Sequence, residues 1–149
     1  MGLENKYEKI VPVDDGFRDL PPEQAFTWNK GILETGSKGL YVVTFYSIRN
    51  PEAGQEKIDR LMQADHEAFE EAKKMPGFYH YFADIVSQEG KSLSFCVWDS
   101  VEDAKKGAGV PKHAEALRYV KEEGANVYRD YKVKGRVVFR INDEIIFTS

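Results

Sequence analysis

Two polar side chains, Asp65 and His113, stand where predicted helices would otherwise present apolar residues. At about 100° per residue, Asp65 falls near the centre of an apolar stripe on a first helix, and His113 shares a face of a second helix with apolar side chains. A carboxylate that orients an imidazole prepares it as a general base, so the pair is a catalytic hypothesis. The alternative is structural: His113 would bond to backbone at the edge of the core, and Asp65 would lie at a seam between helices near a lysine. The stripe around Asp65 consists of Ile58, Leu61, Met62, Phe69 and Ala72, and the residues beside His113 are Leu117 and Val120.

Six further side chains are candidates for binding a ligand. Aromatic residues on strands are also common core residues, and His80 could equally stack in a subunit interface. His66 lies at the flank of the stripe, where partial exposure is expected. The three histidines have no paired spacing and Cys96 is the only cysteine, so we predict no metal site. No flavin or haem motif and no glycine-rich phosphate loop is visible, so no cofactor is expected. The six candidates are Phe45, Tyr46, His66, His80, Tyr81 and Trp98.

The first half of the chain alternates between strand and helix patterns. Residues 40–48 are rich in β-branched and aromatic residues, which predicts a strand. Asn50-Pro51-Glu52 offers a cap, a first-turn proline and an early acid, so a helix is expected from there to about Lys74. Two more strands are predicted at 78–86 and 92–98.

The second half completes a recognisable order of elements. An S-x-x-D capping pattern at Ser100 begins a helical stretch that is interrupted around Gly107 and Gly109 and resumes from Pro111 to about Glu123. The chain is strand-like again from Tyr128, with a hairpin predicted at Asn142-Asp143. The order strand, helix, strand, strand, helix, strand predicts an α+β, ferredoxin-like antiparallel sheet with the helices on one face.

The surfaces of this sheet predict an extension and a dimer. Residues 1–38 are expected to be an N-terminal extension packed on a single domain over 39–149, because Phe17, Phe26 and Trp28 are too apolar for a free tail. The early strands are apolar on both faces, and two helices cover only one of them. The other face should meet the extension, the hairpin or a second subunit; a partner sheet is the commonest cover, so a homodimer is predicted.

Composition excludes several classes of function. The 149 residues are 42% hydrophobic and 31% charged, which is typical of one globular domain. The net charge of -4 is spread without a basic run, so nucleic-acid binding is not expected. No stretch approaches the roughly 20 apolar residues of a membrane span, and the N-terminus lacks the apolar core of a signal peptide. We therefore expect a soluble, cytoplasmic protein.

Over about residues 39–135 the chain resembles the dimeric α/β-barrel superfamily, and within it the antibiotic-biosynthesis-monooxygenase-like (ABM-like) proteins. The resemblance rests on the strand at 40–48, Met75-Pro76-Gly77-Phe78, the segment 95–104 and His113. Members include cofactor-free oxygenases of polycyclic aromatic substrates, haem-degrading enzymes and stress-responsive proteins without assigned activity. The haem-degrading branch is expected to carry an asparagine in the first strand and a tryptophan in the second helix. This chain has neither, so that branch is disfavoured.

The resemblance implies a pocket between sheet and helices for a small aromatic or otherwise hydrophobic molecule. The chain would be a cofactor-independent monooxygenase in which His113 removes a phenolic proton and the resulting anion reacts with dioxygen. The alternative is a non-catalytic, stress-responsive or ligand-sequestering dimer that reuses the fold. An open cavity bordered by Asp65 and His113 would favour the enzyme, and a filled interior would favour the alternative.

Overall fold

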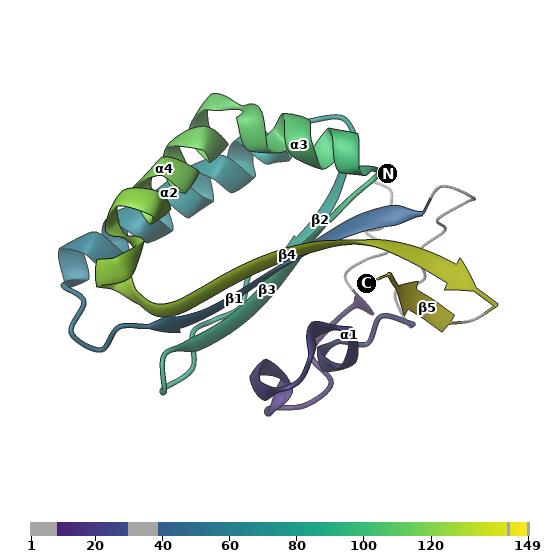
Figure 1. Cartoon of the computed structure of the whole chain (residues 1–149), viewed down its shortest axis with the longest axis horizontal. Helices are drawn as coiled ribbons and strands as arrows, with labels where there is room; N and C mark the ends of the chain where they lie inside the picture. Colours follow the sequence, from purple (N-terminus) through teal and green to yellow (C-terminus); the bar gives the residue numbers. More distant parts are fainter. Residues whose placement is uncertain (1–8, 30–38, 143, 149) are drawn as a thin grey trace.

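The computed structural model describes residues 9–29, 39–142 and 144–148, and its centre is a five-stranded antiparallel sheet. The strands lie in the order β2-β3-β1-β4-β5, so the first strand of the chain is central (Figure 1). The neighbours of β1 are therefore formed by residues much later in the sequence. The strands are β1 (Leu40–Arg49), β2 (Phe78–Phe82), β3 (Lys91–Trp98), β4 (Tyr128–Ile141) and β5 (Glu144–Phe147).

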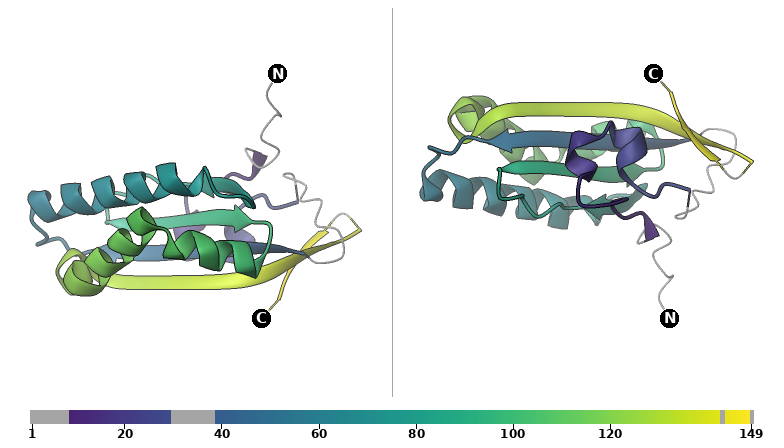
Figure 2. Two further views of the ribbon diagram at one scale, coloured as in Figure 1. Left: turned by 90° about the horizontal axis from the view of Figure 1, so that it is seen from above. Right: turned by 90° about the horizontal axis from the view of Figure 1, so that it is seen from below.

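The helices are divided between the two faces of the sheet. The long helices α2 (Gln55–Ala72) and α4 (Pro111–Val127) lie over one face together with α3 (Val101–Gly109). The short helices η2 (Phe17–Asp19) and α1 (Pro22–Ala25) lie over the other face (Figure 2). The predicted α+β, ferredoxin-like arrangement is confirmed, and within one chain the sheet is open.

The junction between β3 and α3 follows the predicted capping pattern. The Ser100 hydroxyl oxygen accepts a hydrogen bond from the backbone N–H of Asp103 at 3.1 Å, which satisfies one of the free amides of the first turn. The hydroxyl also donates to the Asp103 carboxylate at 2.9 Å. This local bonding fixes where α3 begins, directly after Trp98 at the end of β3.

Two of the element boundaries that differ from the prediction have a cause in side-chain hydrogen bonds. The first long helix begins at Gln55, because Asn50 closes a turn instead: its side-chain oxygen accepts from the N–H of Glu52 at 3.0 Å. The strand predicted to reach residue 86 ends at Phe82, since the carboxylate of Asp84 accepts the N–H of Leu93 at 3.0 Å in place of a strand-to-strand bond.

The predicted C-terminal hairpin is confirmed. Asn142 adopts φ 56°, the left-handed conformation that a tight turn requires and asparagine tolerates. Strand β5 then pairs with β4 from Ile141 with Glu144 to Val138 with Phe147. Asp143, the other predicted turn residue, lies outside the described residues.

The N-terminal segment covers the face of the sheet that the helices leave free. The ring of Phe26 lies 4.8 Å from that of Phe95 on β3 and 5.3 Å from that of Phe82 on β2, and Trp28 lies 4.7 Å from Phe95. Phe17 and Phe26 are 4% and 3% exposed, so this contact is a true core. The chain's own segment thus takes space that a partner sheet was predicted to fill, and the division of the chain at residue 38 stays a prediction.

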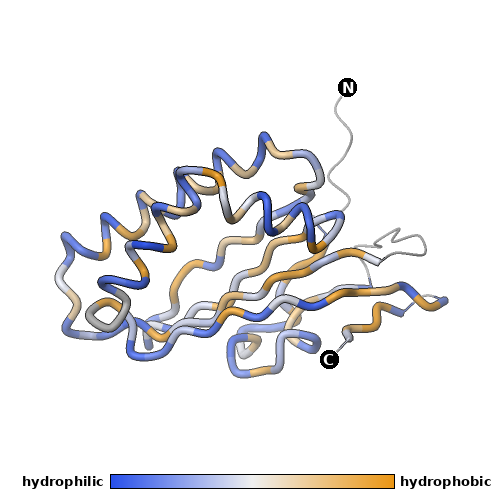
Figure 3. The backbone as a smooth tube through the Cα atoms, turned by 45° about the horizontal axis from the view of Figure 1, so that its top comes forward, coloured by the Kyte–Doolittle hydropathy of each residue, from blue (hydrophilic) through white to orange (hydrophobic). Residues whose placement is uncertain are grey.

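Hydropathy follows this layering. Figure 3 shows apolar stretches along the strands, whereas the two long helices alternate between polar and apolar residues. Such helices have one face for the interior and one for water. Among the described helices, none is long and apolar enough to cross a membrane.

Candidate functional site

A cavity of about 240 Å³ lies between the long helices and the sheet. Two apolar clusters border this space: one around Ala72, Cys96 and Trp98 joins α2 to the sheet, and one around Leu61 and Val127 joins α2 to α4. The space is large enough for a small organic molecule, although it is below the roughly 300–1,000 Å³ of drug-sized pockets.

Strand alternation decides which side chains reach the cavity. Every second residue of β1 from Phe45 to Arg49 lines it, and Ser92 and Trp98 do so from β3. The residues between them point to the N-terminal segment, as buried Phe95 does. The sheet therefore separates an apolar core on one side from a hollow interior on the other.

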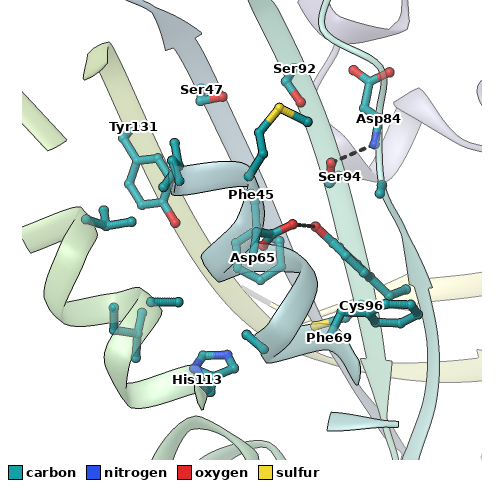
Figure 4. A pocket seen from close by; sticks show the side chains of 18 of the residues that line it. Phe45, Ser47, Asp65, Phe69, Asp84, Ser92, Ser94, Cys96, His113 and Tyr131 are labelled. Carbon is teal, nitrogen blue, oxygen red and sulfur yellow. Dashed lines mark hydrogen bonds between the residues drawn. The ribbon is translucent and has the colours of Figure 1, made fainter. Parts of the chain in front are cut away.

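Asp65 lies midway along the cavity, on α2 (Figure 4). The Tyr81 hydroxyl donates a hydrogen bond to its carboxylate at 3.1 Å. Desolvation by the surrounding protein raises the pKa of the Asp65 carboxyl above its usual 3.8. The hydrogen bond from Tyr81 lowers the pKa, but by less. The residue is nevertheless exposed to water, because the cavity beside it is open. Asp65 is thus a carboxylate that water or a ligand can reach.

His113 lies on the wall of the same cavity, on α4. Its Nδ1 atom is buried and has no hydrogen-bond partner within the described part of the chain. Burial lowers the pKa of His113 below 6.5, while the charge of Asp65 raises it by less. The imidazole is therefore neutral at pH 7 and able to accept a proton. The hydrogen bond of Asp65 goes to Tyr81, so in this state the carboxylate does not orient the imidazole directly.

The six predicted ligand contacts divide between the two faces. Phe45, Tyr81 and Trp98 line the cavity. Tyr46 faces the opposite side, where the Lys132 ammonium lies 5.7 Å from its ring centre, because adjacent strand residues point in opposite directions.

The two remaining histidines also lie away from the cavity. The ring of His80 is half-buried and lies 5.8 Å from that of Phe95, whose side chain is on the face that the N-terminal segment covers. His66 is exposed on the side of α2, one position beyond the cavity-facing Asp65.

Several residues that line the cavity were not predicted from the sequence. Ser47 and Arg49 follow Phe45 at intervals of two, so strand alternation alone could have found them. Tyr128 and Tyr131, with ring centres 4.9 Å apart, come from β4, whose position beside β1 only the topology reveals. Burial raises the pKa of both phenols, so they are neutral hydrogen-bond donors.

A cysteine nucleophile and a metal centre are two further kinds of reactive site. Burial raises the pKa of the Cys96 thiol to about 12, so it is not a thiolate nucleophile at neutral pH. Among the described residues, no three His, Cys, Asp or Glu side chains come together as a metal site requires. The chemistry available on the cavity wall is that of acids, bases and hydrogen-bond donors.

Comparison with known sequences gives a family. The sequence model of the family described as PB2B2.08-like matches residues 2–147. The chain belongs to the PB2B2.08-like family. Since this match includes the N-terminal segment and the C-terminal hairpin, both are part of the family's pattern. No curated protein matches the chain by sequence.

Solved structures share the fold at low identity. A Caulobacter crescentus protein described as a proposed antibiotic biosynthesis monooxygenase has a TM-score of 0.55 and 14% identity, over 69% of this chain and 92% of its own. SnoaB, a cofactor-independent oxygenase from Streptomyces nogalater, has a TM-score of 0.51 and 7% identity, over 72% of this chain and 100% of its own. A conserved protein from Methanosarcina mazei has a TM-score of 0.54 and 14% identity, over 69% and 96%. The predicted likeness to ABM-like proteins is confirmed for the fold, which by itself assigns no chemistry.

Proposed function

We propose that the chain binds a small aromatic molecule in the cavity and oxidises it with dioxygen as a cofactor-independent monooxygenase. One observation carries the proposal: a neutral, half-buried imidazole and a water-accessible carboxylate lie on the wall of one open, largely apolar cavity that includes several aromatic side chains. The proposal is supported by the likeness in fold to SnoaB, which is described as a cofactor-independent oxygenase. An open interior favours the enzyme over a purely structural role.

In the proposed reaction, the substrate supplies all the electrons. His113 removes a proton from a phenol or an activated CH2 group, and the resulting anion gives electrons to dioxygen to form a carbon-bound hydroperoxide. Loss of water from the hydroperoxide converts the CH2 to a carbonyl. One oxygen atom ends in the product and the other in water, so atoms and electrons balance without a further reductant. The Asp65 and Tyr81 pair supplies a hydrogen-bonding site beside the reacting oxygens.

A ligand-sequestering protein without catalysis is the second candidate. The observation that favours it is the bonding of Asp65 to Tyr81, because the Nδ1 atom of His113 then has no partner among the described residues to hold the ring in place. The cavity would then hold the same class of molecule and release it unchanged.

The test is oxidation of an anthrone, an aromatic molecule with one activated CH2 group. Oxygen uptake is measured with an electrode for the wild type, for His113→Ala and for His66→Ala, with the spontaneous rate subtracted. His66 is the matched control because it is exposed and outside the cavity. The proposal expects uptake in the wild type and in His66→Ala, loss of at least 100-fold in His113→Ala, and one atom from labelled dioxygen in the product. Binding of the anthrone without uptake would favour sequestration.

A cytoplasmic location and a homodimer remain further proposals. The N-terminal segment occupies the outer face over β3, so a second copy would have to contact the part of that face near Lys132 on β4 or another surface. Light scattering at micromolar concentration decides the assembly: a particle of twice 17.0 kDa supports the dimer, and one of 17.0 kDa refutes it.

A further inference from the structure

We infer that the end of the cavity at Arg49 binds an anionic group, so the ligand is an aromatic molecule with a carboxylate at one end. This inference rests on the proposed aromatic-binding function and specifies the class of ligand. It assigns to Arg49 a binding role that positions the molecule, away from the site of oxidation.

Arg49 is a half-buried cation with unused bonding capacity. It is the last residue of β1, and its side chain lines the cavity. Its Nε atom is buried and has no hydrogen-bond partner among the described residues. Burying a guanidinium N–H without an acceptor is costly, and an anion placed there would satisfy it with a charge-assisted hydrogen bond.

The surroundings of Arg49 are those of a polar subsite. Ser47 lies two residues before Arg49 on the same strand and lines the cavity with it, and Ser92 is the direct partner of Ser47 on β3, so two small hydroxyl donors lie on this part of the cavity wall (Figure 4). Tyr128 is paired with Arg49 across β1 and β4, and the positive charge of Arg49 lowers the pKa of its phenol against the larger effect of burial. All four groups can donate a hydrogen bond to an oxyanion.

The two acidic residues of the cavity wall, Asp84 and Asp65, are bonded to residues other than Arg49. Asp84 is bound by Arg18 through two hydrogen bonds of 2.7 and 2.8 Å, so its charge is already compensated. Asp65 lies farther along the cavity and is bonded to Tyr81. Among the described lining residues, Arg49 is the only lysine or arginine.

The two ends of the cavity therefore differ in chemistry. His113 lies beside the aromatic end formed with Phe69 and Trp98, and Arg49 lies at the end formed by serines and tyrosines. Because α2 and α4 run along the sheet, a flat molecule between these ends would place its anion at Arg49 and its aromatic ring near His113. This polarity would select the orientation in which a substrate meets the base.

Binding of 2-naphthoate and of its neutral isostere 2-naphthamide, measured by isothermal titration calorimetry at pH 7, tests the inference. The wild type is expected to bind the naphthoate about tenfold more tightly than the amide, as one charge-assisted hydrogen bond predicts. Arg49→Met should abolish this preference and leave affinity for the amide unchanged. Arg118→Met is the matched control, because Arg118 is exposed on α4 outside the cavity; it should change neither affinity.

Each outcome separates the two proposals. Equal wild-type affinities, or an Arg49→Met variant that keeps the preference, would overturn the anion site while aromatic binding stands. If neither the naphthoate nor the naphthamide binds the wild type, both the anion site and the proposed aromatic-binding function are overturned. Circular dichroism checks the fold of Arg49→Met, and Arg49→Lys serves as a second variant: it keeps the charge and should keep most of the preference for the naphthoate.

Discussion

Truncating Phe26 tests whether the N-terminal segment is an integral part of the fold. Its ring is 3% exposed and lies 4.8 to 5.5 Å from four other aromatic rings. Phe to Ala substitutions in cores cost roughly 3–5 kcal/mol, from lost burial and the cavity left behind. Since a domain of this size has about 5–15 kcal/mol of stability, Phe26→Ala should remove a large share of it. At roughly 2–4 °C per kcal/mol, a loss of about 4 kcal/mol lowers the Tm by roughly 8–16 °C.

Urea denaturation followed by circular dichroism gives the free energy of unfolding for both proteins. Val11→Ala is the control, because Val11 belongs to the same segment but its side chain is 44% exposed. That change should cost less than about 0.5 kcal/mol. A Phe26→Ala protein as stable as Val11→Ala would show that the segment does not pack on the sheet, and the reasoning about the covered face would be refuted.

Three further changes test other parts of the structure. Gly107→Ala should lower the free energy of unfolding, measured by urea denaturation, by about 1–3 kcal/mol, because a Cβ there would collide with the indole of Trp98 at the end of β3. The control Gly109→Ala should not lower it, because a Cβ at that position meets no other atom. Arg18→Met should cost about 3 kcal/mol, since it leaves the carboxylate of Asp84, 4% exposed, without its cation; a loss below 1 kcal/mol would contradict this. Asp65→Asn should raise the Tm at pH 7, because the pKa of Asp65 is raised in the folded protein and its ionised carboxylate therefore costs stability at pH values above that pKa. The difference in Tm should shrink toward pH 4, where the carboxyl becomes protonated. A lower Tm for the variant at pH 7 would be the contrary result.

The order of helices and strands could be predicted because each element depends on the types and spacing of residues that are close together in the sequence. The strand over 40–48, the cap at Ser100 and the turn at Asn142 depend on neighbouring residues, and the structure has all three. The helix start at Asn50 was wrong because an Asx turn and a helix cap use the same residue types. The early end of β2 depends on Asp84 and Leu93 and lies beyond local pattern.

The site was harder to predict because it depends on which face each strand turns to the helices. Periodicity could identify Asp65 and His113 as polar residues on apolar helix faces, and both lie on the cavity wall. It could not decide between Phe45 and Tyr46, which alternate on one strand and were both candidates. Nor could it show that Arg49 and Tyr128 meet, since their pairing follows from the position of β4 beside β1.

The most direct test of the central claim is a crystal structure of the protein grown with 2-naphthol. An aromatic phenol has the chemistry proposed for the substrate, and the cavity is open in the free protein. We expect electron density for the ring between Phe45, Phe69 and Trp98, with the hydroxyl directed at His113. An interior filled by the protein's own side chains, or a naphthol bound only elsewhere on the surface, would contradict it.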